Sequence, residues 1–179
     1  MVILISGASH TGKTVLAQRI LDRVGFPYLC LDHLKMGLIR CGYSALTPSE
    51  DDELTAYLWP IAREMVKTAI ENRQNLVVEG CYIPFDWAKD FSDEYRSCIR
   101  HCCLAMTEEY ICGHFDQICR HACAVESRED ESALSTDWLI GQNARNLTLC
   151  KEHGCRCILI DEDYESAIQS ALEELVAGI

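Results

Sequence analysis

Eight consecutive residues near the start of the chain have the types and spacing that bind phosphate. They match the pattern G-x-x-x-x-G-K-[ST] at every fixed position and read Gly7-Ala8-Ser9-His10-Thr11-Gly12-Lys13-Thr14. The glycines allow backbone angles that turn successive N–H groups towards an anion. Lys13 is long enough to reach the β- and γ-phosphates of ATP, and the Thr14 hydroxyl can bind Mg²⁺. The motif therefore predicts that residues 7–14 bind ATP and Mg²⁺, with His10 at a position that needs no particular residue.

The flanking sequence gives this loop the surroundings that phosphate binding requires. Val2–Ser6 is a continuous apolar run of strand length, and Val15–Val24 has the pattern of a helix that ends at Gly25. A loop between a strand and a helix places the phosphates at the helix N-terminus, whose partial positive charge attracts anions. A chance match to the motif would not be expected to lie directly between a strand and a helix.

The remainder of the chain alternates strands with helices, as in a parallel sheet that is covered on both faces. The four further strands expected are Pro27–Leu31, Asn75–Glu79, Cys98–Met106 and Cys155–Ile160. We expect helices over 33–41, 107–123, 137–152 and 162–177, and another that opens with a capping box at Thr47-Pro48-Ser49-Glu50. The polar segment 124–135 is expected to be a mobile loop. The sequence thus predicts a single α/β domain over residues 1–179, with a five-stranded parallel sheet and helices on both faces.

Charge and hydrophobicity argue against two other classes of protein. The chain of 179 residues has a net charge of −12, and its Lys and Arg residues are scattered. A nucleic-acid binder usually has a basic stripe, because phosphate contacts supply most of its affinity. No apolar run approaches the roughly 20 residues that cross a bilayer, and Met1 is not followed by the features of a signal peptide. We therefore expect a cytoplasmic protein that binds neither nucleic acid nor membrane.

Twelve cysteines allow three interpretations: reduced thiols, a metal site and, by their number, a disulfide framework. Because no export signal is visible, we expect reduced thiols that serve as small core residues. Cys112, Cys119 and Cys123 have the helical spacing of a buried stripe. The second is a metal site, since His and Cys residues cluster within 112–123 and within 150–157. Neither cluster has the paired C-x₂-C spacing of a zinc site, which favours the first interpretation.

The loop and the order of the elements resemble the P-loop small-molecule kinases, which include nucleoside monophosphate kinases and shikimate kinase. A GTPase is disfavoured because the guanine-specific sequence Asn-Lys-x-Asp is absent. The resemblance implies transfer of the γ-phosphoryl group of Mg-ATP to a small-molecule acceptor. It also implies that helices within 33–73 bind the acceptor and that a helical lid within 107–149 closes over the phosphates.

Two carboxylates at strand ends are the candidate catalytic groups. Asp32 follows the second strand, as an acceptor-binding aspartate does in shikimate kinase, and it could accept the acceptor's proton or orient its hydroxyl. The alternative is a helix N-cap, for which aspartate is also favoured. Lys35 resembles the arginine of the D-x-x-R of monophosphate kinases, with a solvated helix face as the alternative. Glu79-Gly80 resembles the Asp-Gly of the same enzymes, which implies that Glu79 holds a Mg²⁺-bound water or orients the acceptor.

Arginines within the lid region are candidates for phosphate contacts, because the transition state of phosphoryl transfer spreads negative charge over three oxygens. Monophosphate kinases often carry two arginines four residues apart, and here Asp116 and Arg120 occupy these positions. We assign Arg120 to catalysis and to nucleotide binding, and Arg128 to nucleotide binding. Arg145 is a further candidate. Each could instead be a solvated helix arginine.

These observations predict an ATP-dependent phosphotransferase and leave its acceptor and its oligomeric state open. A nucleoside or nucleotide kinase would differ only in the acceptor, although the arginine of the monophosphate kinases' Asp-Gly motif is missing after Gly80. A regulatory module that binds ATP without an acceptor is the alternative from another class. Asp32 and Glu79 favour a kinase, because a regulatory module needs no carboxylates that face an acceptor.

Overall fold

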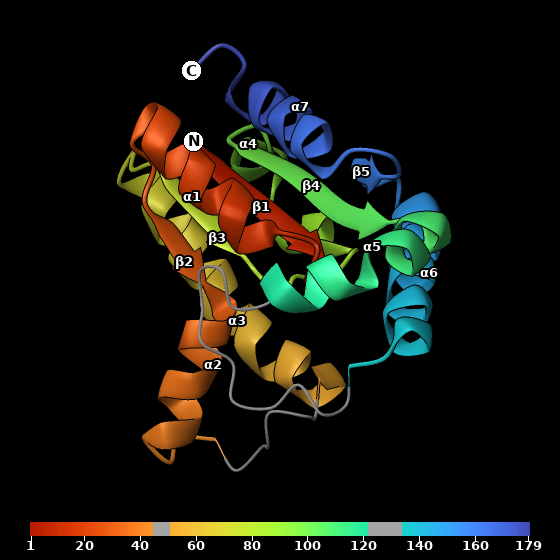
Figure 1. The fold of residues 1–179 in the computed structure, drawn as a ribbon. Helices are drawn as coiled ribbons and strands as arrows, with labels where there is room; N and C mark the ends of the chain where they lie inside the picture. The colour runs from red at the N-terminus through yellow and green to blue at the C-terminus, as the bar shows by residue number, and fades with distance from the viewer. Residues whose placement is uncertain (45–50, 122–133) are drawn as a thin grey trace.

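The computed structural model describes residues 1–44, 51–121 and 134–179, which form a sheet of five parallel strands covered by helices (Figure 1). The order of the strands across the sheet is β2–β3–β1–β4–β5, and each neighbouring pair is parallel. The strands are β1 (Val2–Gly7), β2 (Tyr28–Cys30), β3 (Leu76–Glu79), β4 (Ile99–Met106) and β5 (Cys157–Ile160). The predicted α/β fold with a five-stranded parallel sheet is confirmed.

The described helices connect these strands, and several of their ends agree with the sequence prediction. They are α1 (Lys13–Val24), α2 (Leu31–Arg40), α3 (Asp51–Glu71), the 3₁₀ helix η1 (Trp87–Asp90), α4 (Asp93–Arg96), α5 (Glu108–His121), α6 (Thr136–His153) and α7 (Tyr164–Val176). Gly25 and Gly154 end α1 and α6 in the left-handed conformation. None of these described helices is long and apolar enough to cross a membrane.

β1 lies at the centre of the sheet, and its side chains explain why helices pack on both faces of the sheet. All six of its residues are buried. Ile3 and Ile5 pack with residues of α1 and α7, whereas Val2 and Leu4 pack on the opposite face with residues of α3. Because successive strand residues face opposite sides of a sheet, one apolar run contributes to both cores.

α5 and α6 pack together at the carboxyl end of β4. Met106, the last residue of β4, is buried with Tyr110 and Ile111 of α5 and Leu139 of α6. Asn143 of α6 is 1% exposed. Its Oδ1 accepts a hydrogen bond from the Met106 N–H at 2.8 Å, and its Nδ2 donates to the Leu139 carbonyl at 2.8 Å. These bonds fix α6 against the end of the sheet.

α2 begins at Leu31, two residues earlier than the sequence predicts. Leu31 is fully buried, and Cys30, which is extended, is the N-cap. Asp32 therefore lies in the first turn of the helix, and its interpretation as the N-cap is wrong. The predicted capping box at 47–50 and most of the loop predicted over 124–135 lie outside the described residues.

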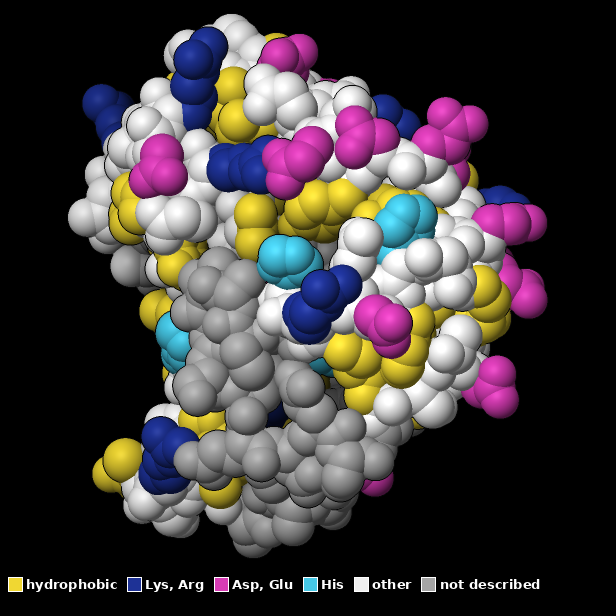
Figure 2. Space-filling model, in the orientation of Figure 1, with side chains coloured by type: hydrophobic (Ala, Val, Ile, Leu, Met, Phe, Trp, Pro, Cys, Tyr) yellow, Lys and Arg dark blue, Asp and Glu magenta, His cyan; other side chains and the backbone are white. Residues whose placement is uncertain are grey.

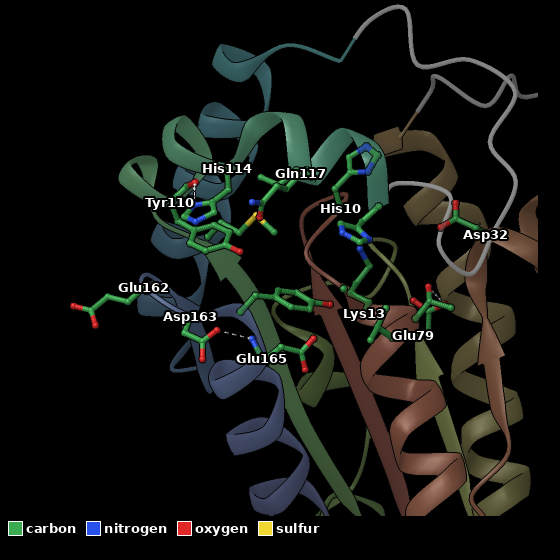
Figure 3. A pocket seen from close by; sticks show the side chains of 17 residues that line it. His10, Lys13, Asp32, Glu79, Tyr110, His114, Gln117, Glu162, Asp163 and Glu165 are labelled. Atoms are coloured by element: carbon green, nitrogen blue, oxygen red, sulfur yellow. Dashed lines mark hydrogen bonds between the residues drawn. The ribbon is translucent and has the colours of Figure 1, made fainter.

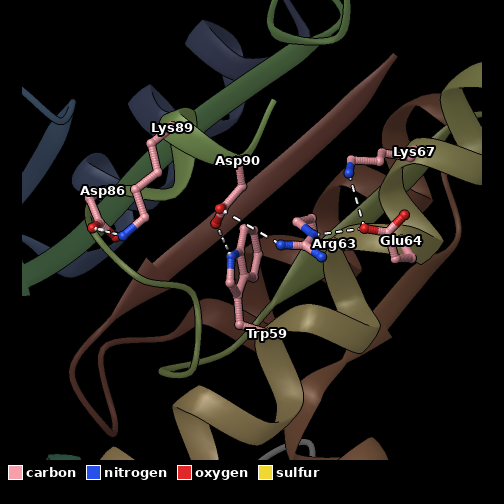
Figure 4. Close-up of polar contacts among 7 residues, drawn as sticks. All are labelled: Trp59, Arg63, Glu64, Lys67, Asp86, Lys89 and Asp90. Atoms are coloured by element: carbon pink, nitrogen blue, oxygen red, sulfur yellow. Dashed lines mark hydrogen bonds and ion pairs between the residues drawn. The ribbon is translucent and has the colours of Figure 1, made fainter. Parts of the chain in front are cut away.

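The connection from β3 to β4 contains η1 and α4, which the sequence did not predict. It is docked on α3, because Trp59 Nε1 donates a hydrogen bond to Asp90 Oδ2 at 2.7 Å (Figure 4). Arg63 Nη1 lies 3.7 Å from Asp90 Oδ1, and the ring of Phe91 packs edge-on against Trp59 at a centroid distance of 6.1 Å. This docking holds the end of η1 against α3.

Replacing Asn143 with alanine is expected to destabilise the protein by about 1–3 kcal/mol, because the buried Met106 N–H then lacks an acceptor. Unfolding in urea, followed by circular dichroism, measures this loss. Thr148→Ala is the matched control, since Thr148 is exposed on the same helix and its hydroxyl donates to the Ala144 carbonyl at 3.0 Å. Equal stability of the two variants would show that Asn143 does not anchor α6.

Candidate functional site

The loop between β1 and α1 has two glycines at positions where a side chain would not fit. Gly7 has φ +144°, and a Cβ atom there would lie 2.4 Å from the Leu104 carbonyl oxygen. Gly12 has φ +88°, and its Cβ atom would lie 2.1 Å from Tyr164 Oη. Strand β4 and the start of α7 thus confine the loop from two sides. Both fixed glycines of the motif are required by backbone conformation and by packing.

Side chains of the loop fold over the Ala8 carbonyl. Thr11 Oγ1 and Lys13 Nζ each donate a hydrogen bond to this oxygen at 2.8 Å. Gly12 is the N-cap of α1 and offers no side chain to the first N–H groups of the helix. Such N–H groups, together with the helix dipole, form a site for an anion. His10 has a positive φ of 65°, which tightens the turn between Ala8 and Gly12.

A cavity of about 490 Å³ lies over this loop (Figure 3). Its volume falls within the roughly 300–1,000 Å³ of small-molecule sites. The loop and α1 contribute His10, Gly12, Lys13, Thr14 and Val15 to its wall. Asp32 of α2 and Glu79 of β3 lie on one side of it, whereas α5 and the start of α7 lie on the other. The structure therefore places Lys13, Thr14, Asp32 and Glu79 on one cavity.

Glu79, the last residue of β3, is 1% exposed and accepts a hydrogen bond from Thr14 Oγ1 at 3.1 Å. Burial raises the pKa of its carboxyl group above the usual 4.5, although the charge of Lys13 and hydrogen bonds from Cys30 and Thr14 oppose this rise. The nearby charge of Asp32 raises the pKa further. A cation would relieve this excess negative charge. A hydroxyl and a carboxylate are oxygen ligands of the kind that Mg²⁺ prefers, so Thr14 and Glu79 fit Mg²⁺.

Lys35 joins Asp32 to the segment that follows β3. Its Nζ donates to Asp32 Oδ1 at 2.7 Å and to Tyr82 Oη at 2.9 Å. Its side chain is 12% exposed, so the interpretation of Lys35 as a solvated helix residue is wrong. The ion pair orients the Asp32 carboxylate, because the ammonium group is itself held by the buried Tyr82.

The remaining wall of the cavity contains residues that the sequence analysis did not identify. Tyr110 and His114 of α5 stack with ring centroids 4.2 Å apart and planes 14° apart. The other residues here are Met106, Gln117, Ile118, His121, Glu162, Asp163, Tyr164 and Glu165. Flat rings and apolar side chains beside a phosphate site are suited to a nucleobase. The positions 110, 114, 117 and 121 lie on one face of a helix, and this spacing was the signal available in the sequence.

Neither Arg120 nor Arg145 is among the described residues that line this cavity. Arg120 is exposed on α5, and its Nε donates to the Asp116 carbonyl at 3.1 Å. Near Arg120 on α5, the side chains that line the cavity are those of Gln117, Ile118 and His121. Arg145 lines a second, smaller cavity. Arg128 lies outside the described residues.

Acidic side chains border the cavity. Glu162, Asp163 and Glu165 line its edge. On the face that Figure 2 shows, Asp and Glu side chains are spread over the surface, and the Lys and Arg side chains stand apart from one another. A phosphate ligand therefore depends on donors of the loop and of the α1 N-terminus rather than on a broad positive field.

The cysteines only partly follow the sequence prediction. Those buried are Cys30, Cys102, Cys103 and Cys150. Cys112 is exposed and Cys119 is only partly buried, so the predicted buried stripe is wrong; α5 buries Tyr110 and Ile118 instead. Cys123 lies outside the described residues. Within the described ranges, no three His, Cys, Asp or Glu side chains are placed to hold a metal ion. Mg²⁺ needs fewer protein ligands, because waters and phosphate oxygens complete its shell.

The raised pKa of Glu79 predicts that Glu79→Gln stabilises the ligand-free protein at neutral pH. Burial in the folded state destabilises the ionised carboxylate and so lowers the free energy of unfolding. This loss is fully present above the folded-state pKa of Glu79, and it disappears as the pH falls below the unfolded-state pKa near 4.5. Urea unfolding at several pH values measures how much more stable Glu79→Gln is than the wild type. This difference in the free energy of unfolding should shrink as the pH falls from neutral towards the unfolded-state pKa.

Glu64→Gln is the control for this experiment. Glu64 is exposed, and hydrogen bonds from Lys67 and Arg63 hold the pKa of its carboxyl below the usual value (Figure 4). The control should show no gain in stability at neutral pH. A Glu79→Gln variant that is less stable than the wild type at neutral pH would contradict the electrostatic description of Glu79.

No protein-family model and no curated protein matches the sequence. Solved structures with the same arrangement do exist. Deoxyadenosine kinase from M. mycoides superposes with a TM-score of 0.57 at 13% identity, over 98% of each chain. Shikimate kinase from Bacteroides thetaiotaomicron gives a TM-score of 0.52 at 18% identity, also over 98% of each chain. A gluconokinase from Sinorhizobium meliloti 1021 gives 0.51 at 16% identity, over 97% of this chain and 90% of that one.

At these identities the similarity establishes the fold and leaves the substrate open. The three structures are kinases of different small molecules, and this chain spans nearly the whole length of each. Their shared architecture agrees with the resemblance that the phosphate-binding loop and the order of elements predict. The chain has the fold of the P-loop small-molecule kinases.

Proposed function

We propose that the chain transfers the γ-phosphoryl group of Mg-ATP to a small-molecule acceptor. The observation that carries this proposal is the hydrogen bond from Thr14 to the buried carboxylate of Glu79 beside Lys13, at the N-terminus of α1. Binding a phosphate requires only the loop, the lysine and the helix N-terminus. A buried carboxylate next to them adds a metal ligand, which phosphoryl transfer uses. The fold shared with small-molecule kinases supports the same conclusion.

In this proposal the phosphates of ATP lie on residues 7–14, and Lys13 exchanges the Ala8 carbonyl for phosphate oxygens. The base lies against Tyr110 and His114, at the far end of the cavity. Thr14 and Glu79 hold Mg²⁺, which when bound neutralises charge on the β- and γ-phosphates.

The reaction exchanges one phosphorus–oxygen bond for another. The acceptor hydroxyl oxygen forms a bond to the γ-phosphorus, while the bond from that phosphorus to the bridging oxygen breaks and ADP leaves with the electron pair. Asp32 accepts the hydroxyl proton or orients the hydroxyl. A contact of Arg120 with the nucleotide requires that its side chain release the Asp116 carbonyl, to which its Nε donates.

One alternative to this proposal differs in the acceptor, and another has no acceptor. A nucleoside or nucleotide kinase is consistent with the similarity to deoxyadenosine kinase, whose structure contains dCMP and dCDP. The gluconokinase and shikimate kinase similarities point to acceptors of another kind. A regulatory module that binds ATP has no use for the ion pair of Asp32 with Lys35 inside the cavity wall, and this pair favours an enzyme. A screen of ATP turnover against nucleosides, nucleotides, sugars and small hydroxylated compounds separates the three.

Lys13→Ala is expected to weaken Mg-ATP binding about 10- to 100-fold, because a charge-assisted contact of roughly 1.5–3 kcal/mol is lost. Calorimetry measures the affinity, and circular dichroism shows whether the helices remain. Lys89→Ala is the control, since Lys89 is exposed and pairs with Asp86 at the surface. Unchanged affinity in Lys13→Ala would contradict the proposed nucleotide site.

Asp32→Asn is expected to lower kcat by about 10²–10⁴-fold and to leave ATP affinity nearly unchanged, because an amide cannot accept the acceptor's proton. The same change also breaks the ion pair with Lys35. Lys35→Gln therefore serves as the matched variant, since it breaks the pair and keeps the carboxylate. A kcat that falls equally in both variants would show that Asp32 acts only through the ion pair.

A further inference from the structure

The carboxylate of Glu79 has a close neighbour on the adjacent strand. Cys30, the last residue of β2, lies opposite Glu79 in the parallel register of β2 and β3. Neighbouring strands of a sheet lie about 4.8 Å apart, so side chains at opposite positions on one face can reach each other. Both residues end their strands at the edge of the sheet where the phosphate-binding loop begins.

The residues that precede this pair show which face of the sheet it occupies. One position earlier in each strand, Leu29 and Val78 belong to the apolar cluster on the α3 side. Successive strand residues point to opposite faces, so Cys30 and Glu79 point to the α1 side. The Thr14 hydroxyl of α1 bonds Glu79 on that same side. The thiol, the carboxylate and the hydroxyl therefore meet on one face.

Cys30 does not have either of two ordinary roles for its position. It is 2% exposed, yet it belongs to none of the apolar clusters that the described residues form. It is also the N-cap of α2, where a polar side chain usually accepts from the first N–H groups, and its side chain makes no such bond. The thiol instead donates a hydrogen bond to the Glu79 carboxylate, which opposes the rise in the pKa of Glu79.

The Glu79 carboxylate thus accepts hydrogen bonds from two different elements. Thr14 Oγ1 of α1 donates to Glu79 Oε1 at 3.1 Å, and the Cys30 thiol donates from β2. Because an ionised carboxylate has about four lone-pair sites, others remain for a metal ion or a water bound to it. Donors on two elements restrict the rotation of the carboxylate, and such restraint is what the groups around a metal ligand provide.

The two donors differ in their access to a ligand. Thr14 lines the cavity over the phosphate-binding loop, as does Glu79. Cys30 is not among the described residues that line this cavity. A bound nucleotide and its metal therefore meet Thr14 and Glu79 directly, whereas Cys30 acts on them through the carboxylate.

We infer that Cys30 is a positioning residue for the metal site, whose thiol holds the Glu79 carboxylate in the orientation that binds a divalent ion beside Thr14. This inference rests on the proposed function, which assigns Mg²⁺ to Thr14 and Glu79. Removing a group that hydrogen-bonds a metal ligand typically lowers metal affinity about 10- to 100-fold. A thiol is a weak donor, so the loss here belongs at the lower end, about 10-fold.

The test is calorimetric binding of ATP to the full chain, with and without Mg²⁺, for the wild type, Cys30→Ala and Cys30→Ser. The ratio of the two ATP affinities measures the gain that the metal provides. We expect Cys30→Ala to lower this gain about 10-fold and to leave ATP affinity without Mg²⁺ no weaker than in the wild type. Cys30→Ser keeps a donor in a side chain of similar size and should retain most of the gain.

Cys102→Ala is the matched control. It removes the same thiol from a strand residue that is 1% exposed, and Cys102 is not among the described residues that line the cavity. Its gain from Mg²⁺ should equal that of the wild type. The inference is overturned if Cys30→Ala keeps the full gain, or if Cys30→Ser loses as much of it as Cys30→Ala, since the donor would then play no part.

A second measurement needs no nucleotide. Urea unfolding at neutral pH gives the loss of stability that Cys30→Ala causes in the wild type and in the Glu79→Gln background. The loss should be larger in the wild type, because hydrogen bonds to charged groups are the stronger ones. Equal losses in both backgrounds would overturn the role of the thiol.

The same titrations separate this inference from the proposed function. A wild type that binds ATP with no gain from Mg²⁺ would contradict the proposed function and, with it, the role of Cys30. A normal gain in the wild type that survives in Cys30→Ala would overturn the role of Cys30 alone and leave the proposed function standing.

Discussion

A buried carboxylate at the end of β3 is the constraint on which the rest of the site depends. Burial disfavours the charge of Glu79, and this cost is offset by Lys13 and Thr14 of the phosphate-binding loop together with Cys30 of β2. The sheet makes this meeting possible, because Ile5 of β1 lies opposite Glu79 in the parallel register. The loop that follows β1 therefore begins beside the carboxylate. Lys13 and Thr14 reach it from the first turn of α1, and the same two residues are those that the motif assigns to phosphate and metal.

The topology of the sheet distributes the remaining groups around this centre. In an open parallel sheet, ligands bind at the carboxyl ends of the strands. Asp32 follows β2, Tyr82 follows β3, and α5 and the start of α7 follow β4 and β5. The loop after β1 borders two cavities. The rings of Tyr110 and His114 line one of them, and Arg145 is among the described residues that line the other.

The sequence predicted the parts of this structure that depend on local pattern. The apolar run of β1, the glycines at 7 and 12 and the left-handed ends at Gly25 and Gly154 follow from dihedral and burial preferences of neighbouring residues. The position of Glu79 on the cavity could also be anticipated, because a residue at the carboxyl end of a parallel strand faces the ligand edge.

The features that could not be predicted depend on how distant elements pack. The rotation of α5 turns Tyr110 inward and Cys112 outward, and it is set by contacts with α6 rather than by the spacing of cysteines. The burial of Lys35 depends on Tyr82, which is 47 positions away in the chain. Arg145 was a candidate for phosphate, yet the anchoring of α6 at Asn143 places it on the second cavity.

The most direct measurement is the effect of Mg²⁺ on ATP affinity, determined by calorimetry with and without the metal for the wild type and for Glu79→Gln. If Thr14 and Glu79 hold the ion against the phosphates, Mg²⁺ should strengthen ATP binding in the wild type, and the gain should fall sharply in the variant because an amide is a weaker metal ligand. ATP binding without metal should be no weaker in the variant, since the buried negative charge is gone. An identical gain from Mg²⁺ in both proteins would contradict a metal site at Glu79.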